Sequence, residues 1–203
     1  MKLTATMAAA LVMIGTLACA PPDDGVTGPP TTTVPPASGT PLRFVRRLTA
    51  DELAASLQVT TGVAWTDYAS HAATLGRPDQ LHTLVEGEQI SLAFMRFAED
   101  GARATCHSAV RAERNLTDPA MRPVLGAVVL ATPDPAVRTA NLRRLLLRFH
   151  GTDVTSDADP RLAPYQNILD TTLGGHAAAA DVELARWETV CVALATHLDF
   201  LTY

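Results

Sequence analysis

Cysteine is the residue type whose chemistry is most informative in this 203-residue chain, and there are three of them. Cys106 and Cys191 are candidates for a disulfide, which an oxidising compartment allows. The bond would close a separation of 85 residues and contribute about 4–5 kcal/mol by the loop-entropy argument. Cys191 lies on the apolar face of its predicted helix, whereas Cys106 lies off the apolar stripe of its own helix. The alternative is two buried free thiols, and the sequence leaves both open.

Cys19 has a different expected role, because it follows an apolar segment near the start of the chain. The residues Thr16-Leu17-Ala18-Cys19 are similar to a lipobox, with Thr16 in the place where leucine is usual. A competing cut after Ala20 is disfavoured because Pro21 would follow it. We therefore predict that Cys19 is lipidated, which gives more than the two acyl chains needed for stable anchoring. An ordinary secreted protein with an incidental Cys19 is the alternative.

The histidines do not form a recognised metal motif. None belongs to an HExxH sequence, and none pairs with a carboxylate at the spacing of a zinc site. The adjacent Cys106 and His107 point to different sides of a helix, which is poor geometry for one ion. His150 precedes Gly151, so we expect it to interact favourably with the C-terminus of its own helix. We predict no metal site and no cofactor. The six histidines are His71, His82, His107, His150, His176 and His197.

The remaining polar clusters give weak signals for chemistry. Asp153, Asp157 and Asp159 lie in one predicted loop, but the spacing lacks the glycine and the final glutamate of a calcium loop. Asp159 stands before Pro160, a pattern typical of a helix cap. No serine or threonine lies in a Gly-x-Ser-x-Gly elbow. We therefore predict no catalytic residue, and a non-catalytic protein is favoured over an enzyme.

These residues are distributed over three segments. Residues 1–18 are predicted to be a lipoprotein signal peptide, since Met1-Lys2 precedes an apolar run too short to span a bilayer. Residues 19–42 hold seven prolines and almost no large apolar side chains, so we expect the lipidated cysteine to be followed by a disordered tether. Residues 43–203 are long enough to bury the core of a single domain.

Residues 43–203 are predicted to be all-α, because apolar residues recur at helical spacing. Thr49 and Glu52 form a capping box for a helix at 50–60. Asp134 and Pro135 begin another helix, which Gly151 ends. We expect further helices at 66–75, within 86–113, at 119–131 as a weaker one, at 160–173 or starting only at 164, and at 177–199.

The last predicted helix has the clearest apolar face. Its apolar residues alternate by four and three, which predicts a buried seam. Apolar side chains continue to Tyr203, so we expect the end of the chain to be pinned into the core. The seam residues are Trp187, Cys191, Leu194, Leu198 and Leu201.

Two segments carry a resemblance to a known group. Arg46-Arg47-Leu48-Thr49-Ala50-Asp51-Glu52-Leu53 and the closing segment 187–203 resemble the first and last helices of helical domains of unknown function. These domains occur in secreted proteins of planctomycetes and myxobacteria, often beside c-type cytochrome modules. Residues 142–151 are similar to the short myxobacterial lipoproteins of that group. The resemblance implies a helical fold and carries no catalytic residue, and this chain lacks the CxxCH haem motif.

The net charge and the predicted segments of the chain favour some classes of function over others. The net charge of −5 gives no basis for nucleic-acid binding, which needs basic surface. We expect a lipoprotein of the cell envelope, anchored in the outer membrane if the cell is Gram-negative, with a protein partner. Its domain is expected to be a non-catalytic binding or accessory module. The alternative is an enzyme or redox accessory that acts with a cytochrome-type partner. A deep pocket that holds several convergent polar side chains would favour the alternative, and a shallow apolar surface patch would favour the binding module.

Overall fold

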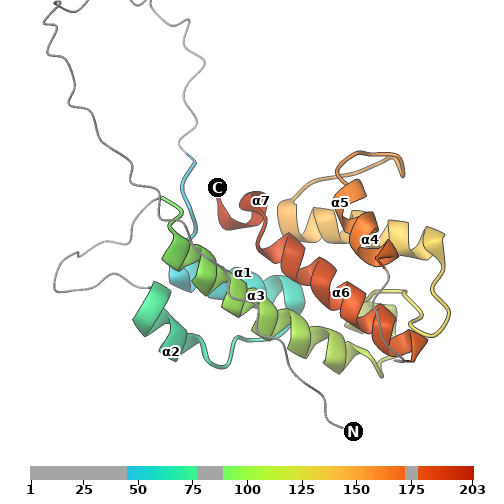
Figure 1. Ribbon diagram of the computed structural model, residues 1–203, viewed down its shortest axis with the longest axis horizontal. Coiled ribbons are helices and arrows are strands. Elements are labelled where there is room, and N and C mark those ends of the chain that lie inside the picture. Colours follow the sequence, from blue (N-terminus) through green and yellow to red (C-terminus); the bar gives the residue numbers. More distant parts are fainter. Residues whose placement is uncertain (1–44, 77–88, 172–177) are drawn as a thin grey trace, which may run out of the picture. The chain divides into compact units, whose positions relative to one another are not determined.

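The computed structural model describes residues 45–76, 89–171 and 178–203, all within one compact unit that spans Arg43–Tyr203 (Figure 1). The predicted signal peptide, Cys19 and the predicted tether lie outside the described residues, as do His82 and His176. The domain is all-α, as the sequence predicts. No helix in the described part is both long and apolar enough to cross a membrane. The helices are α1 (Ala50–Thr61), α2 (Tyr68–His71), α3 (Leu92–Glu113), α4 (Pro135–His150), α5 (Ala163–Asp170), α6 (Ala179–Ala195) and α7 (Leu198–Leu201), with a π turn at Ala72–Gly76 and a 3₁₀ turn at Pro119–Met121.

Local sequence signals fix where α1 and α4 begin and end. The Thr49 hydroxyl accepts the N–H of Glu52, and the Glu52 carboxylate accepts the N–H of Thr49, so the predicted capping box is confirmed. Asp134 caps α4 by accepting the N–H of Ala136. Gly151 ends α4 with a φ of 63°, in the left-handed region that glycine adopts without strain.

The long helices α3 and α6 pack against each other and hold the centre of the domain. Figure 1 shows α6 passing between α3 on one side and the α4–α5 pair on the other, while α1 lies along a different side of α3. The helix α3 is covered on two sides. Phe94 and Phe97, on its apolar face, and Cys106, which lies outside that face, are therefore all buried. The largest fully buried side chains are Trp187, Phe94, Phe97, Leu53, Leu57, Leu125, Leu142, Leu145, Leu162, Leu169, Leu194 and Leu201.

The predicted helix at 119–131 is wrong. Only a 3₁₀ turn forms there, and the chain then makes a series of turns in which Gly126 has a φ of 53°. The buried Glu113 carboxylate accepts the backbone N–H groups of Val124 and Leu125, at 2.9 and 2.6 Å for the shortest contacts. A glutamate from α3 therefore satisfies the donors that a helix would have satisfied internally.

The end of the chain is pinned into the core, but not as one long helix. The helix α6 ends at Ala195, His197 caps the short α7, and the predicted seam residue Leu198 is 59% exposed. Trp187 is fully buried, as predicted. The N–H of Leu48 donates to the carbonyl of Leu201 at 2.8 Å, and Arg47 and Thr202 form an antiparallel bridge. The start and end of the described domain are thus joined by backbone hydrogen bonds.

Candidate functional site

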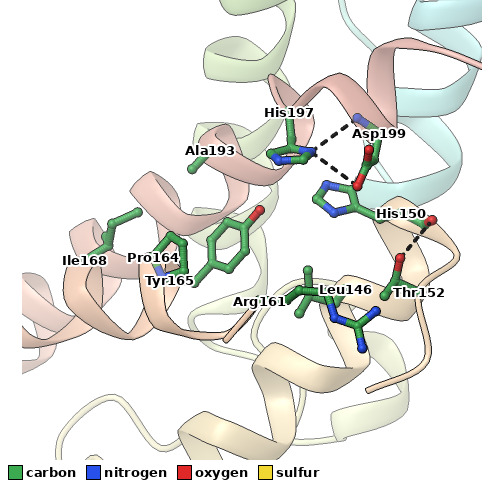
Figure 2. A pocket seen from close by; sticks show the side chains of 10 residues that line it. All are labelled: Leu146, His150, Thr152, Arg161, Pro164, Tyr165, Ile168, Ala193, His197 and Asp199. Carbon is green, nitrogen blue, oxygen red and sulfur yellow. Dashed lines mark hydrogen bonds and ion pairs between the residues drawn. The ribbon is translucent and has the colours of Figure 1, made fainter. Parts of the chain in front are cut away.

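A pocket of about 270 Å³ lies where α4, α5 and α6 meet the short α7 (Figure 2). Its apolar lining comes from three helices. Six polar side chains, which the sequence spreads over 49 positions, converge around it. The apolar residues are Leu146, Pro164, Ile168 and Ala193, and the polar residues are His150, Thr152, Arg161, Tyr165, His197 and Asp199.

His150 occupies the last position of α4 and is half-buried. Its Nε2 lies 2.9 Å from the carbonyl oxygen of Leu194, so Nε2 carries the proton and donates it. This corrects the expectation that His150 serves its own helix, because the carbonyl it contacts belongs to the last turn of α6. Burial lowers the pKa of His150, which the bond to Leu194 opposes and the neighbouring His197 reinforces. A neutral ring with a free Nδ1 lone pair is the result near pH 7.

His197 joins the same corner from the other side. It is the N-cap of α7, and its Nδ1 accepts the N–H of Asp199 at 3.2 Å. Figure 2 shows the His197 ring stacked on the His150 ring, with Asp199 beside both. The ring centroids lie 4.8 Å apart with an angle of 28° between the planes. One ligand atom from each of His150, His197 and Asp199 lies within 4.8 Å of the other two.

No sequence motif indicates this cluster. His150 and His197 are 47 positions apart, and only their place at the end of α4 and at the α6–α7 corner brings them together. The expectation of no metal site rested on local spacing, which does not detect ligands contributed by separate helix ends. The one local signal is that His197 and Asp199 flank a single residue next to a helix start.

Two further side chains define the polarity of the pocket. Burial raises the pKa of Tyr165 to about 12, and the Asp199 carboxylate acts in the same direction. The phenol therefore stays protonated and is a hydrogen-bond donor near the cluster. Arg161 holds Asp159 through two contacts of 2.9 and 2.7 Å, and this hydrogen bonding lowers the pKa of Asp159 to about 2. The guanidinium charge of Arg161 is thus largely balanced before any ligand arrives.

The remaining predicted site residues lie elsewhere. Cys106 and Cys191 form a disulfide with an Sγ–Sγ distance of 2.06 Å, which links α3 to α6. Asp157 pairs with Arg143 and Asp159 with Arg161, so these loop carboxylates are engaged with arginines.

The other two described histidines are also outside the pocket. His107 Nδ1 lies 3.0 Å from Glu188 on the outer surface of α3 and α6. His71 packs on Trp65, with 5.3 Å between the ring centroids.

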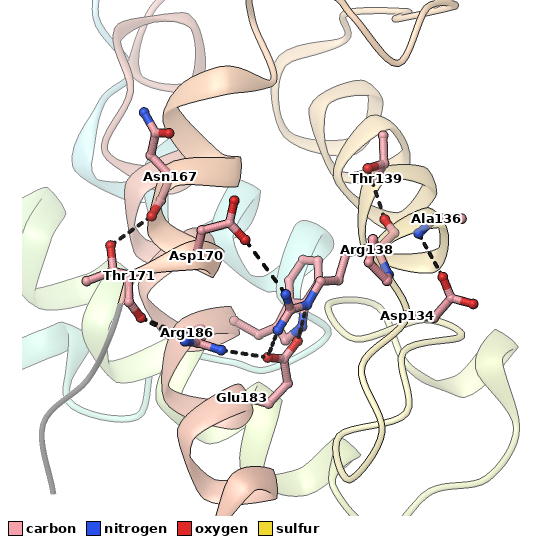
Figure 3. A network of polar contacts seen from close by, with 11 residues as sticks. Asp134, Ala136, Arg138, Thr139, Asn167, Asp170, Thr171, Glu183 and Arg186 are labelled. Atoms are coloured by element: carbon pink, nitrogen blue, oxygen red, sulfur yellow. Dashed lines mark hydrogen bonds and ion pairs between the residues drawn. The ribbon is translucent and has the colours of Figure 1, made fainter.

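A second polar network connects α4, α5 and α6 around the buried Glu183 (Figure 3). The fully buried Glu183 accepts a two-point contact from Arg138 and a hydrogen bond of 2.9 Å from the indole N–H of Trp187. Arg186 adds a contact to Glu183 at 3.5 Å and donates to the Thr171 carbonyl at 2.8 Å. Every polar group of Glu183 is satisfied by the protein itself, so we assign this network to stability rather than to ligand binding.

The comparisons with known proteins identify no relative: no family model matches the chain, and neither a curated protein nor a solved structure matches it. Among the hydrogen bonds of the described residues, no hydroxyl is bonded to the imidazole of His150 or His197. A nucleophile and its base must be within hydrogen-bond reach, and these contacts contain no such pair, whereas the convergence of six polar side chains is the feature expected of an enzyme or redox accessory.

Proposed function

We propose that this protein is a membrane-anchored lipoprotein of the bacterial cell envelope whose helical domain binds a protein partner without catalysing a reaction. The observation that carries the proposal is the pocket between α4, α5, α6 and α7, which combines an apolar lining with a polar rim. This is the composition of a docking site, where an apolar anchor enters a cleft and polar groups fix its orientation.

The size of the pocket is compatible with a protein partner. Sites for drug-sized ligands and cofactors occupy about 300–1,000 Å³, and this pocket holds about 270 Å³. That volume suits one or two side chains of a partner. Leu146 and Ile168 would contact the apolar anchor, while the protonated Tyr165 phenol would donate to a partner carbonyl.

Two features support a location outside the cytoplasm. The disulfide between Cys106 and Cys191 is stable in oxidising compartments and rare in reducing ones. The segment before the domain has the composition of a signal peptide followed by a lipid-acceptor cysteine at Cys19. Both features support export and anchoring, and the Pro-rich residues after Cys19 give the domain reach from the membrane.

The proposal is tested by photo-crosslinking in intact cells of the source bacterium. A photoreactive amino acid at Ile168, in the pocket, should give a discrete adduct. The matched control carries it at Val59 on α1, which is exposed and does not line the pocket. Adding Ala193→Arg, which fills the pocket with a charged side chain, should abolish the Ile168 adduct. An adduct that persists with Ala193→Arg, or that forms equally from Val59, would refute pocket docking.

A further inference from the structure

We propose that His150, His197 and Asp199 bind a single divalent transition-metal ion such as Zn²⁺. Two imidazoles and one carboxylate converge at the rim of the pocket. Imidazole nitrogens suit Zn²⁺, Cu²⁺ and Ni²⁺ rather than Mg²⁺ or Ca²⁺, which prefer oxygen ligands. The inference goes beyond partner binding and does not depend on it, because the three residues come from this chain alone.

The distances allow the cluster to close on one ion. The three ligand atoms lie within 4.8 Å of one another. Ligands about 2.0–2.1 Å from a tetrahedral zinc are separated by about 3.4 Å, so the groups must approach by little more than 1 Å. His197 and Asp199 are exposed side chains at the start of α7, and if Nδ1 of His197 keeps its cap contact with the N–H of Asp199, its Nε2 is the atom left for the ion. The half-buried His150 would then be the fixed ligand.

The hydrogen bond that His150 donates through one ring nitrogen is of the kind that metal-bound histidines make. Metal-bound histidines almost always donate their second ring N–H to a carboxylate or a backbone carbonyl, which fixes the tautomer and the ring orientation. Here Nε2 donates to the Leu194 carbonyl at 2.9 Å, which leaves the Nδ1 lone pair for the ion. The contact is independent of the three-residue convergence, because it involves α6 backbone rather than another ligand.

The number of ligands indicates what the ion would do. Structural zinc sites are closed by four protein ligands, whereas sites with three protein ligands keep a position for water or an incoming group. Beside the cluster lie the Tyr165 phenol and the apolar lining of the pocket. An ion held here would therefore present an open coordination position toward whatever enters the pocket.

The chain contains a matched control for adventitious metal binding. His107 and Glu188 are also a histidine and a carboxylate in contact, at 3.0 Å, on the exposed surface of α3 and α6. No third ligand joins that pair in the described residues. A pair of this kind gives weak surface binding, so His107→Gln should leave the specific site intact.

The test is a calorimetric titration of the full chain, purified in detergent and freed of metal with a chelator, with Zn²⁺ as the probe. We expect one ion per chain. His197→Ala and Asp199→Asn, which change exposed side chains, should each weaken binding at least tenfold while the circular dichroism spectrum stays helical. His107→Gln should bind as the wild type does. Absence of a one-to-one phase, or equal weakening by His107→Gln, would overturn the proposal. No partner protein is present, so failure here is distinct from failure of pocket docking.

Discussion

Glu183 is the residue on which the buried network depends. It lies fully buried on α6 and is held by Arg138, Arg186 and the Trp187 indole. Burying a carboxylate costs free energy unless charged and polar partners compensate, and removing one member of such a group leaves the others uncompensated. The network around Glu183 therefore stabilises the contact between α4 and α6 only when all of its charged and polar side chains are present.

Replacing that carboxylate should be costly for stability. We expect Glu183→Gln to lower the free energy of unfolding by about 3–5 kcal/mol, because the largely buried guanidinium of Arg138 loses its nearest counter-charge and keeps only the more distant Asp170. Urea denaturation followed by circular dichroism measures the change. Glu188→Gln is the control on the same helix, since its exposed contact with His107 should contribute less than about 1 kcal/mol. Equal effects of the two substitutions would contradict the assignment.

The buried environment of His150 makes stability depend on pH. The pKa of His150 is lowered in the folded protein by burial, so the unfolded chain binds this proton more readily than the folded one. Stability from this group is complete above the unfolded pKa of about 6.5 and is lost as the pH falls below it. In chelator-containing buffer, the wild type should lose more stability between pH 7 and pH 5 than His150→Gln. If the stability of the wild type and of His150→Gln falls equally between pH 7 and pH 5, burial of the His150 ring does not make stability depend on pH.

At the scale of elements, the sequence predicts helices best where caps and glycines mark their ends. The capping box at Thr49 and the glycine at Gly151 set boundaries that the structure confirms within a residue or two. The segment 119–131 could not be predicted, because the partner of its backbone is Glu113, on a different element. The break after Ala195 was missed for a related reason: apolar residues continue through it.

The pocket could not be predicted from local sequence patterns either. Cys106 and Cys191 could be named as a candidate pair, since cysteine chemistry has few alternatives. His150 was assigned to its own helix end, and His197 had no assigned role, because their contact depends on how α4 packs on α6. A periodic sequence pattern shows which residues share a face of one helix. The residues of this site come from different helices, so no such pattern indicates them.

Gly101 allows α3 to pack closely against the ring of Trp65. A Cβ atom there would lie 2.6 Å from the Trp65 ring, which is itself packed on Phe97 at 4.8 Å between centroids. Gly101→Ala gains about 1 kcal/mol of helix propensity but overpacks the core at a cost of about 1–3 kcal/mol. We expect the overpacking to outweigh the gain, with a net loss of up to about 2 kcal/mol in chemical denaturation. Ser108→Ala, at an exposed position of α3, should be neutral or slightly stabilising. A more stable Gly101→Ala protein would contradict the close packing.

For the whole molecule, the disulfide and the paired chain ends link segments that are far apart in sequence. The disulfide closes a separation of 85 residues between the two central helices. We expect the double substitution Cys106→Ala/Cys191→Ala to lower the free energy of unfolding by about 2–5 kcal/mol. Denaturation of the double variant, compared with the wild type before and after reduction, measures this. If reduction leaves wild-type stability unchanged, the bond contributes nothing and the domain depends on packing alone.

We propose that Cys19 anchors a helical binding domain to a membrane, and fatty-acid labelling tests this proposal most directly. The chain has three cysteines, and two of them are paired with each other, so Cys19 is the thiol left to carry a lipid. Cells supplied with a labelled fatty acid should label the wild type and leave Cys19→Ala unlabelled, with the variant released from the membrane fraction. Equal labelling of both proteins, or no labelling of the wild type, would contradict the account.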